Sequence, residues 1–203
     1  MPSHSPPDPA LRPVVARVAG LNLGYFGIEI AVALAIGSVA LIADSLDFLE
    51  DAAINLLIFA GIGWSVRNRA RLGMALAGIL LLPALATAYA AWEKFATLAP
   101  PDPLPLTLTG LGALAVNMTC AAMLSAHRDG SGSLTRAAFL SARNDAYANL
   151  AIIAAGLVTA LTLSPWPDLV AAAGIAVLNA DSAGDIIRAA RAEWRAATTA
   201  DGT

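Results

Sequence analysis

Long apolar runs dominate the sequence and restrict the folds that it can adopt. Residues 105–126 contain no charged side chain, and about 20 predominantly apolar residues are enough for a helix to cross a bilayer. The whole chain is 58% hydrophobic and 13% charged, whereas a typical soluble domain is about 25% charged. These features exclude an ordinary soluble domain and predict an all-α integral membrane protein.

Proline, glycine and short polar segments divide the apolar stretches into six predicted transmembrane helices. The predicted spans are residues 14–36, 39–65, 72–98, 105–126, 137–163 and 167–190. We therefore expect a six-transmembrane-helix bundle over residues 13–190. A disordered, proline-rich N-terminal tail over residues 1–12 should precede it, and a short cytoplasmic C-terminal tail over residues 191–203 should follow. The N-terminal tail lacks the basic region and cleavage site of a signal peptide.

Basic residues are concentrated at one end of the predicted spans. Arginines flank the start of the first span, two of the connections and the end of the sixth span, whereas the opposite side carries only Lys94. Because lysine and arginine near span ends favour the cytoplasm, we expect both termini to be cytoplasmic. We therefore predict a multi-pass protein of the plasma (inner) membrane. Its expected partner is the lipid bilayer, and no nucleic acid is expected.

Four acidic residues interrupt the second predicted span, namely Asp44, Asp47, Glu50 and Asp51. At 100° per residue they fall within an arc of roughly 120° on one helix face, and Asn55 continues the stripe. A carboxylate in mid-span costs roughly 2.5–3.5 kcal/mol on insertion scales. No run of intramembrane lysine or arginine is available to balance these charges. Protonation, a bound metal or a water-filled cavity must compensate, and a cation pathway provides all three.

The fifth predicted span carries a second concentration of polar residues. Ser141, Asp145 and Asn149 follow one another at i, i+4 spacing and therefore form one stripe. In the first span, Asn22 and Glu29 are seven residues apart and also share a face. If the second and fifth helices are neighbours, carboxylate and amide oxygens converge at mid-membrane. Oxygen-rich sites suit hard divalent cations, whereas imidazole and thiolate favour zinc.

The order of these motifs resembles that of the cation diffusion facilitator family. GSVALIADSLDFLEDAAINLL is similar to the family's second transmembrane helix, in which an ADxx(H/D)xxxD pattern supplies two metal ligands. RAAFLSARNDAYANLAIIAAGL resembles the fifth helix, whose HxxxD pattern supplies the other two. Further likenesses in NLGYFGIEIAVALAIGSVAL, LAVNM and WPDLVAAAGIAVL extend the resemblance over roughly residues 12–190.

The resemblance implies a transporter that exports a divalent metal from the cytoplasm in exchange for protons, with homodimerisation. It carries over Asp47, Asp51 and Asp145 as metal ligands. Ser141 stands where the family has histidine, which leaves Ser141, Asn144 or Asn149 to complete the shell and weakens the case for zinc. The transported metal stays open among Zn, Co, Cd, Mn and Fe, and no separate cofactor is expected.

Four further polar side chains are assigned to a proton or ion pathway, namely Asp44, Glu50, Glu29 and Asn22. The family usually also carries a cytoplasmic C-terminal domain. We do not expect that domain here, because residues 191–203 are too few to form it.

Several residues have alternative interpretations. Glu29 could pair with Arg143, the one arginine deep in a predicted span. Asp168 follows SPWP and fits a helix N-cap as well as a metal contact. The intramembrane asparagines could have no role beyond hydrogen bonding between helices. Cys120 fits a small buried apolar residue.

The function has alternatives too. One is a non-transporting membrane metal sensor, or a subunit that depends on a partner. Another is an Mg-dependent intramembrane prenyl- or phosphotransferase that uses DSLDFLE as an acidic array. Such an enzyme needs a second acidic cluster and basic residues for the phosphates, whereas Asp145 stands alone with only Arg143 close by. We therefore expect a transporter and no enzyme.

Overall fold

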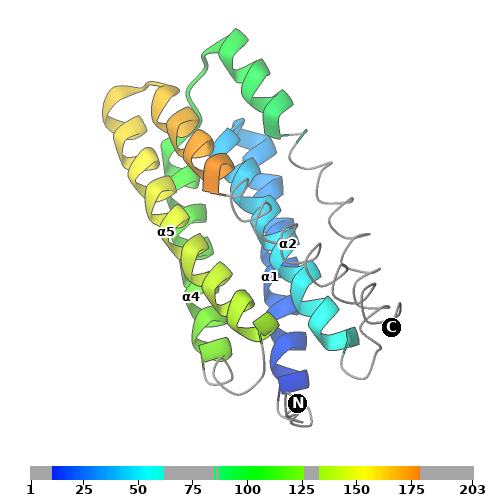
Figure 1. Ribbon diagram of the computed structural model, residues 1–203. Helices are drawn as coiled ribbons and strands as arrows, with labels where there is room; N and C mark the ends of the chain where they lie inside the picture. Colours follow the sequence, from blue (N-terminus) through cyan, green and yellow to red (C-terminus); the bar gives the residue numbers. More distant parts are fainter. Residues whose placement is uncertain (1–10, 62–84, 86, 126–132, 179–203) are drawn as a thin grey trace.

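The computed structural model describes residues 11–61, 85, 87–125 and 133–178, and the regular structure in these residues is helical (Figure 1). The helices are α1 (Leu11–Ile36), α2 (Val39–Gly61), α4 (Pro103–Ser125) and α5 (Ser133–Thr162). Two further helical segments cover residues 87–97 and Trp166–Leu178. The expected all-α fold is confirmed over this part of the chain.

Glycine and proline set the helix boundaries that can be compared with the sequence. α1 ends at Ile36 because Gly37 adopts a φ of 64°, a left-handed conformation that glycine enters without strain. α4 begins at Pro103, where the missing N–H costs no hydrogen bond. The Asp102 carboxylate caps this helix by accepting a hydrogen bond from the Leu104 N–H at 3.1 Å.

The described helices lie within or over the predicted spans. α1, α4 and the Ala142–Thr162 part of α5 are long and apolar enough to cross a membrane, and Trp166–Leu178 is a shorter apolar helix. α2 has the necessary length, but its four acidic residues reduce its apolar character. α1 already includes Leu11 and Arg12, at the predicted boundary of the N-terminal tail. Residues 62–84 and 179–203 lie outside the described part, so the full lengths of the third and sixth spans are not tested.

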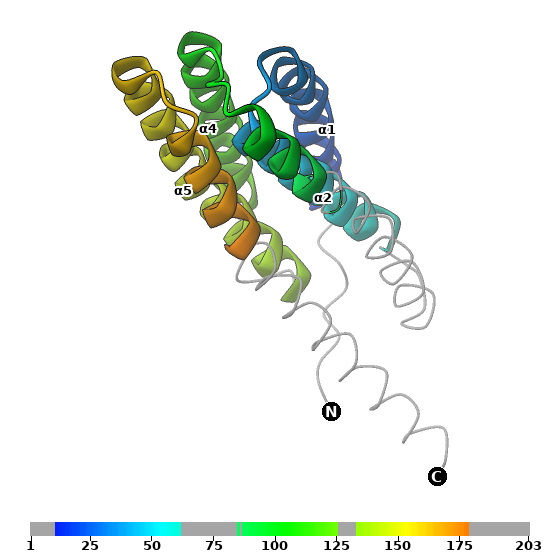
Figure 2. The same cartoon turned by 90° about the horizontal axis from the view of Figure 1, so that it is seen from above.

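The helices form two antiparallel pairs that pack side by side. α1 pairs with α2 and α4 pairs with α5, while α1 also contacts α4 and α2 contacts α5 (Figures 1 and 2). One buried apolar cluster lies near the α1–α2 turn and includes Leu41, Ile152 and Ile175. A second cluster, with Val15 and Leu124, lies toward the opposite ends of these helices. The polar side chains of the predicted site fall between the two clusters.

Large apolar side chains also cover the outside of the bundle. Leu34 is 68% exposed and Leu161 is 86% exposed, and Val177 and Leu108 are exposed as well. In water such a surface would drive association, whereas lipid tails solvate it. The bundle is therefore apolar outside and polar inside at the level of its acidic residues.

Candidate metal centre

The acidic stripe of α2 faces the interior of the bundle. Asp44 is fully buried, Asp47 is 7% exposed and Asp51 is 2% exposed, and Asn55 lies one turn further along the same face. Glu50 is only partly buried. This arrangement follows from helix periodicity, since residues three and four apart stack on one side of a helix. The chain thus directs these carboxylates inward, away from the lipid-facing surface.

α5 brings its own polar stripe against the stripe of α2. Asn149 is fully buried, and its Nδ2 donates hydrogen bonds to Asp44 Oδ1, at 3.3 Å, and to the backbone carbonyl of Asp145. The Asp145 carboxyl lies close enough to those of Asp51 and Asp47 for their charges to interact. Acidic side chains from the two helices therefore occupy one shared region of the interior.

Glu29 of α1 adds another carboxyl to this region. It is fully buried, and neither of its oxygens accepts a hydrogen bond from a described residue. Its carboxyl interacts most strongly with that of Asp44, which lies at hydrogen-bond range, and then with that of Asp47. We call the five carboxyls of Glu29, Asp44, Asp47, Asp51 and Asp145 the acid cluster.

The suggested pair between Glu29 and Arg143 is not formed. Arg143 is exposed and donates a hydrogen bond to the Asn144 side chain at 3.5 Å. Arg143 precedes Asp145 by two residues on α5, and a separation of two residues turns a helical side chain by about 200°. Since Asp145 faces the carboxyls of α2, Arg143 points away from them and does not neutralise Glu29.

Asn22 lies at the level of Asp51 rather than that of Glu29. It is fully buried, and the Cys120 thiol of α4 donates a weak hydrogen bond to Asn22 Oδ1 at 3.8 Å. Cys120 in turn interacts electrostatically with Asp51. Burial of Cys120 agrees with its interpretation as a small core residue, but its position beside the acid cluster left no signal in the sequence.

A tyrosine that sequence reasoning did not single out closes one side of the acid cluster. The Tyr25 ring packs against Phe48 with 5.0 Å between ring centroids, and its hydroxyl donates a hydrogen bond to the Thr109 carbonyl at 2.6 Å. The Tyr25 hydroxyl also interacts electrostatically with Glu29 and Asp44. Aromatic packing therefore helps to keep water from this end of the cluster.

Of the three side chains predicted to complete the metal shell, the structure describes Asn144 and Asn149 but not Ser141. Ser141 belongs to α5, four residues before Asp145, but its side chain lies outside the described part of the structure. Among the described residues, no three Asp, Glu, His or Cys side chains are already gathered into a group that could hold a metal ion. In the part of the chain that the structure describes, the carboxyls of the acid cluster are therefore neighbours that do not yet form a compact ligand group.

Asp168 has a defined partner at the other end of α2. Its carboxylate accepts hydrogen bonds from the first turn of α2, including one from the Val39 N–H at 2.9 Å. Of its two predicted roles, the structure gives it capping, but of α2 rather than of its own helix. Asp168 is therefore engaged in holding two helices together.

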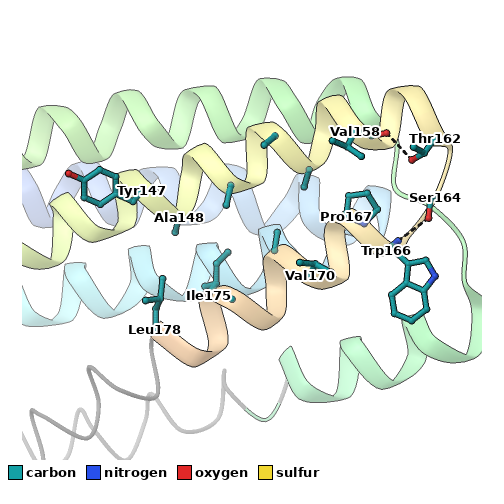
Figure 3. A pocket seen from close by; sticks show the side chains of 15 residues that line it. Tyr147, Ala148, Val158, Thr162, Ser164, Trp166, Pro167, Val170, Ile175 and Leu178 are labelled. Carbon is teal, nitrogen blue, oxygen red and sulfur yellow. Dashed lines mark hydrogen bonds between the residues drawn. The ribbon is translucent and has the colours of Figure 1, made fainter.

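An apolar groove lies apart from the acid cluster. It has a volume of about 740 Å³ and runs between α5 and the Trp166–Leu178 helix, lined by residues such as Tyr147, Val158 and Ile175 (Figure 3). None of its lining residues is acidic. The groove therefore has no chemistry suited to a metal ion.

Comparison with known families agrees with the polar interior of the bundle. Residues 15–193 match the family model of the cation efflux transmembrane domain, which covers the helices that carry the acid cluster. No individual curated protein gives a match. Members of this family are transporters of metal cations and are not enzymes. The chain therefore belongs to the cation efflux, or cation diffusion facilitator, family and is an integral membrane transport domain.

Proposed function

We propose that the protein exports a divalent metal from the cytoplasm in exchange for protons, by alternating access. The observation that carries this proposal is the meeting of acidic side chains from α2 and α5, in which the partly buried Asp145 interacts electrostatically with the buried Asp51 and Asp47. Intramembrane carboxylates of this kind mark ion pathways. Membership of the cation efflux family supports a metal as the ion.

In the proposed mechanism, Asp47, Asp51 and Asp145 bind the metal in their ionised forms. Ser141 or Asn149 completes the shell from the same face of α5. Protons that enter from the outer side compete for the carboxylates and displace the metal, because ligands must be deprotonated to coordinate. Asp44, Glu50, Glu29 and Asn22 line the route by which the ion or the protons reach this site.

The proposed topology has six transmembrane helices in the inner membrane, with both termini in the cytoplasm. α1, α2, α4 and α5 correspond to the first, second, fourth and fifth spans, and the two further helical segments correspond to parts of the third and sixth spans. The arginine bias of the sequence supports this orientation. We further propose that the protein works as a homodimer and that the cargo is Zn, Co, Cd, Mn or Fe.

The test is metal uptake into proteoliposomes across these five ions, with and without an imposed pH gradient. Wild type should transport at least one ion and respond to the gradient. Asp51→Asn and Asp145→Asn should abolish that transport, whereas Asp102→Asn should not, since Asp102 is exposed and distant from the acid cluster. Normal transport by both interior variants would contradict the assigned site. Metal binding without flux in the wild type would favour a sensor or a partner-dependent subunit instead.

A further inference from the structure

The α1–α2 turn is held by a carboxylate from a distant part of the chain. Asp168 is fully buried and accepts hydrogen bonds from Ser38 Oγ at 2.6 Å, the Val39 N–H at 2.9 Å and the Ala40 N–H at 3.3 Å. Ser38 Oγ also accepts the Leu41 N–H at 3.1 Å. These contacts satisfy the N–H groups that open α2, which otherwise lack partners at a helix start.

A lysine holds the end of α1 at the same place. Lys94 Nζ, from the helical segment 87–97, donates a hydrogen bond to the Gly37 carbonyl at 2.6 Å. Its positive charge also interacts with Asp168. A cation at a helix C-terminus and an anion at a helix N-terminus are each favourable. We call Gly37, Ser38, Lys94 and Asp168 the outer clasp.

An aromatic contact joins the two helical segments that supply the charges of the clasp. The rings of Phe95 and Trp166 meet edge to face, with 6.0 Å between centroids and 70° between planes. Lys94 neighbours Phe95, and Asp168 lies two residues after Trp166. The contacts therefore connect α1, α2, segment 87–97 and the Trp166–Leu178 helix at one end of the bundle.

Burial along α2 differs sharply between its two ends. Residues 38–45, next to the clasp, are buried without exception, whereas Leu56 is exposed and several residues from 53 to 60 are only partly buried. A helix enclosed at one end and looser at the other is the arrangement expected of a pathway closed on one side. The enclosed end is the side that carries few basic residues.

We infer that the outer clasp is the gate that closes the outer side of the transport pathway, and that Asp168 and Lys94 are positioning residues for α2. Opening to the outside requires α2 to separate from the Trp166–Leu178 helix, which breaks the Asp168 contacts. The strength of the clasp then sets the balance between states that open inward and outward. This inference rests on the proposed alternating access and topology.

The experiment uses the full chain with Ser45→Cys as a reporter. Ser45 is fully buried on α2, close to the clasp, and Cys120 is the chain's single natural cysteine and is buried as well. A membrane-impermeant thiol reagent is applied to the outer face of bacterial spheroplasts that express the protein. The parent chain without Ser45→Cys supplies the background rate. Labelling of the reporter measures how often the outer side opens.

Asp168→Ala should raise the outer labelling rate roughly tenfold, since it removes three hydrogen bonds to a charged group. Lys94→Met should raise the rate several-fold, and Lys94→Arg should keep it near wild type because it retains the charge and the donor. Asp102→Ala is the matched control. Asp102 also caps a helix at this end, but it bonds only within its own segment, to the Leu104 N–H, so its removal should leave labelling unchanged.

Wild-type labelling rates in both Asp168→Ala and Lys94→Met would overturn the inference, and so would an equal rise in Asp102→Ala. If Asp168→Ala does not fold, Asp168→Asn takes its place and should give a smaller rise of the same sign. The inference fails separately from the proposed function. Metal transport by the Asp51→Asn variant would refute the metal site, but it would not change the labelling result that tests the clasp. Labelling of Ser45→Cys that rises only when the reagent is applied to the cytoplasmic face would refute the topology.

Discussion

The outer clasp and the acid cluster both contain buried carboxyls, but they differ in the hydrogen-bond donors that surround these carboxyls. Both Asp168 oxygens accept hydrogen bonds, from three donors on the consecutive residues 38–40 at the start of α2. The oxygens of Glu29 and Asp44 Oδ2 accept no hydrogen bond from an N–H or hydroxyl group of the described residues, and these two carboxyls lie against each other instead. A buried carboxyl with its donors in place stabilises a fold, whereas one without donors has a cost that only a mobile cation can offset. The difference separates residues that build the bundle from residues that work in it.

The largest effect should come from the ligand carboxyls. Asp51→Asn and Asp145→Asn should each lower metal transport by about 100-fold or more, and the double variant should be no worse than either, because ligands of one ion act as a unit. The thermal midpoint of the purified protein should change much less than transport does, since asparagine keeps the shape of each side chain. Uptake assays and thermal unfolding on the same preparations measure both. Additive losses from the two substitutions would contradict a shared site.

At the clasp, removal of a carboxyl should lower the stability of the fold. Asp168→Ala should lower the free energy of unfolding by about 3 kcal/mol, because three hydrogen bonds to a buried carboxylate are lost at roughly 1 kcal/mol each. Unfolding in detergent, followed by circular dichroism, measures the change. Asp102→Ala, which removes an exposed cap, should cost no more than about 1 kcal/mol. If the two variants lowered the free energy of unfolding equally, the Asp168 cap between two helices would be no more stabilising than the Asp102 cap within one segment.

Acid should weaken metal binding by a smaller but steady amount. Metal coordinates ionised carboxylates, so a falling pH protonates the ligands and lowers affinity, by up to about tenfold per pH unit for each proton displaced. Calorimetric titrations with the transported ion at several pH values give both the affinity and the protons released. An affinity that stays constant as the pH falls would show that binding displaces no protons, and would remove the basis for exchange.

The comparison also explains which parts of the molecule a sequence can reveal. The inward direction of Asp47 and Asp51 was predictable, because charge inside an apolar run is anomalous and helix periodicity fixes its face. The partner of Asp168 was not, since it lies about 130 residues away in the chain and consists largely of backbone N–H groups. Lys94 binds a backbone carbonyl, and such a partner leaves no mark on the residue pattern.

The failure of the pair between Glu29 and Arg143 has a related cause. Composition suggested that the one deep arginine should meet a deep glutamate, but the two-residue offset from Asp145 places Arg143 on the opposite side of α5. Charge matching from sequence ignores the direction of side chains, which decides whether two residues on different helices can meet. All-α folds with strong periodicity therefore reveal the polar face of each helix better than the pairing between helices.

The smallest predicted effect tests the claim that the acid cluster costs stability. Glu29→Gln preserves the shape of the side chain, removes a buried ionisable group and supplies an amide donor near Asp44, whose Oδ2 faces the Glu29 carboxyl. It should therefore raise the free energy of unfolding by about 1 kcal/mol. Thermal unfolding measures this, with Glu93→Gln as the control because Glu93 is exposed and its substitution should change little. A loss of stability in Glu29→Gln would mean that Glu29 already has a favourable partner, and that the acid cluster helps to build the bundle much as the clasp does.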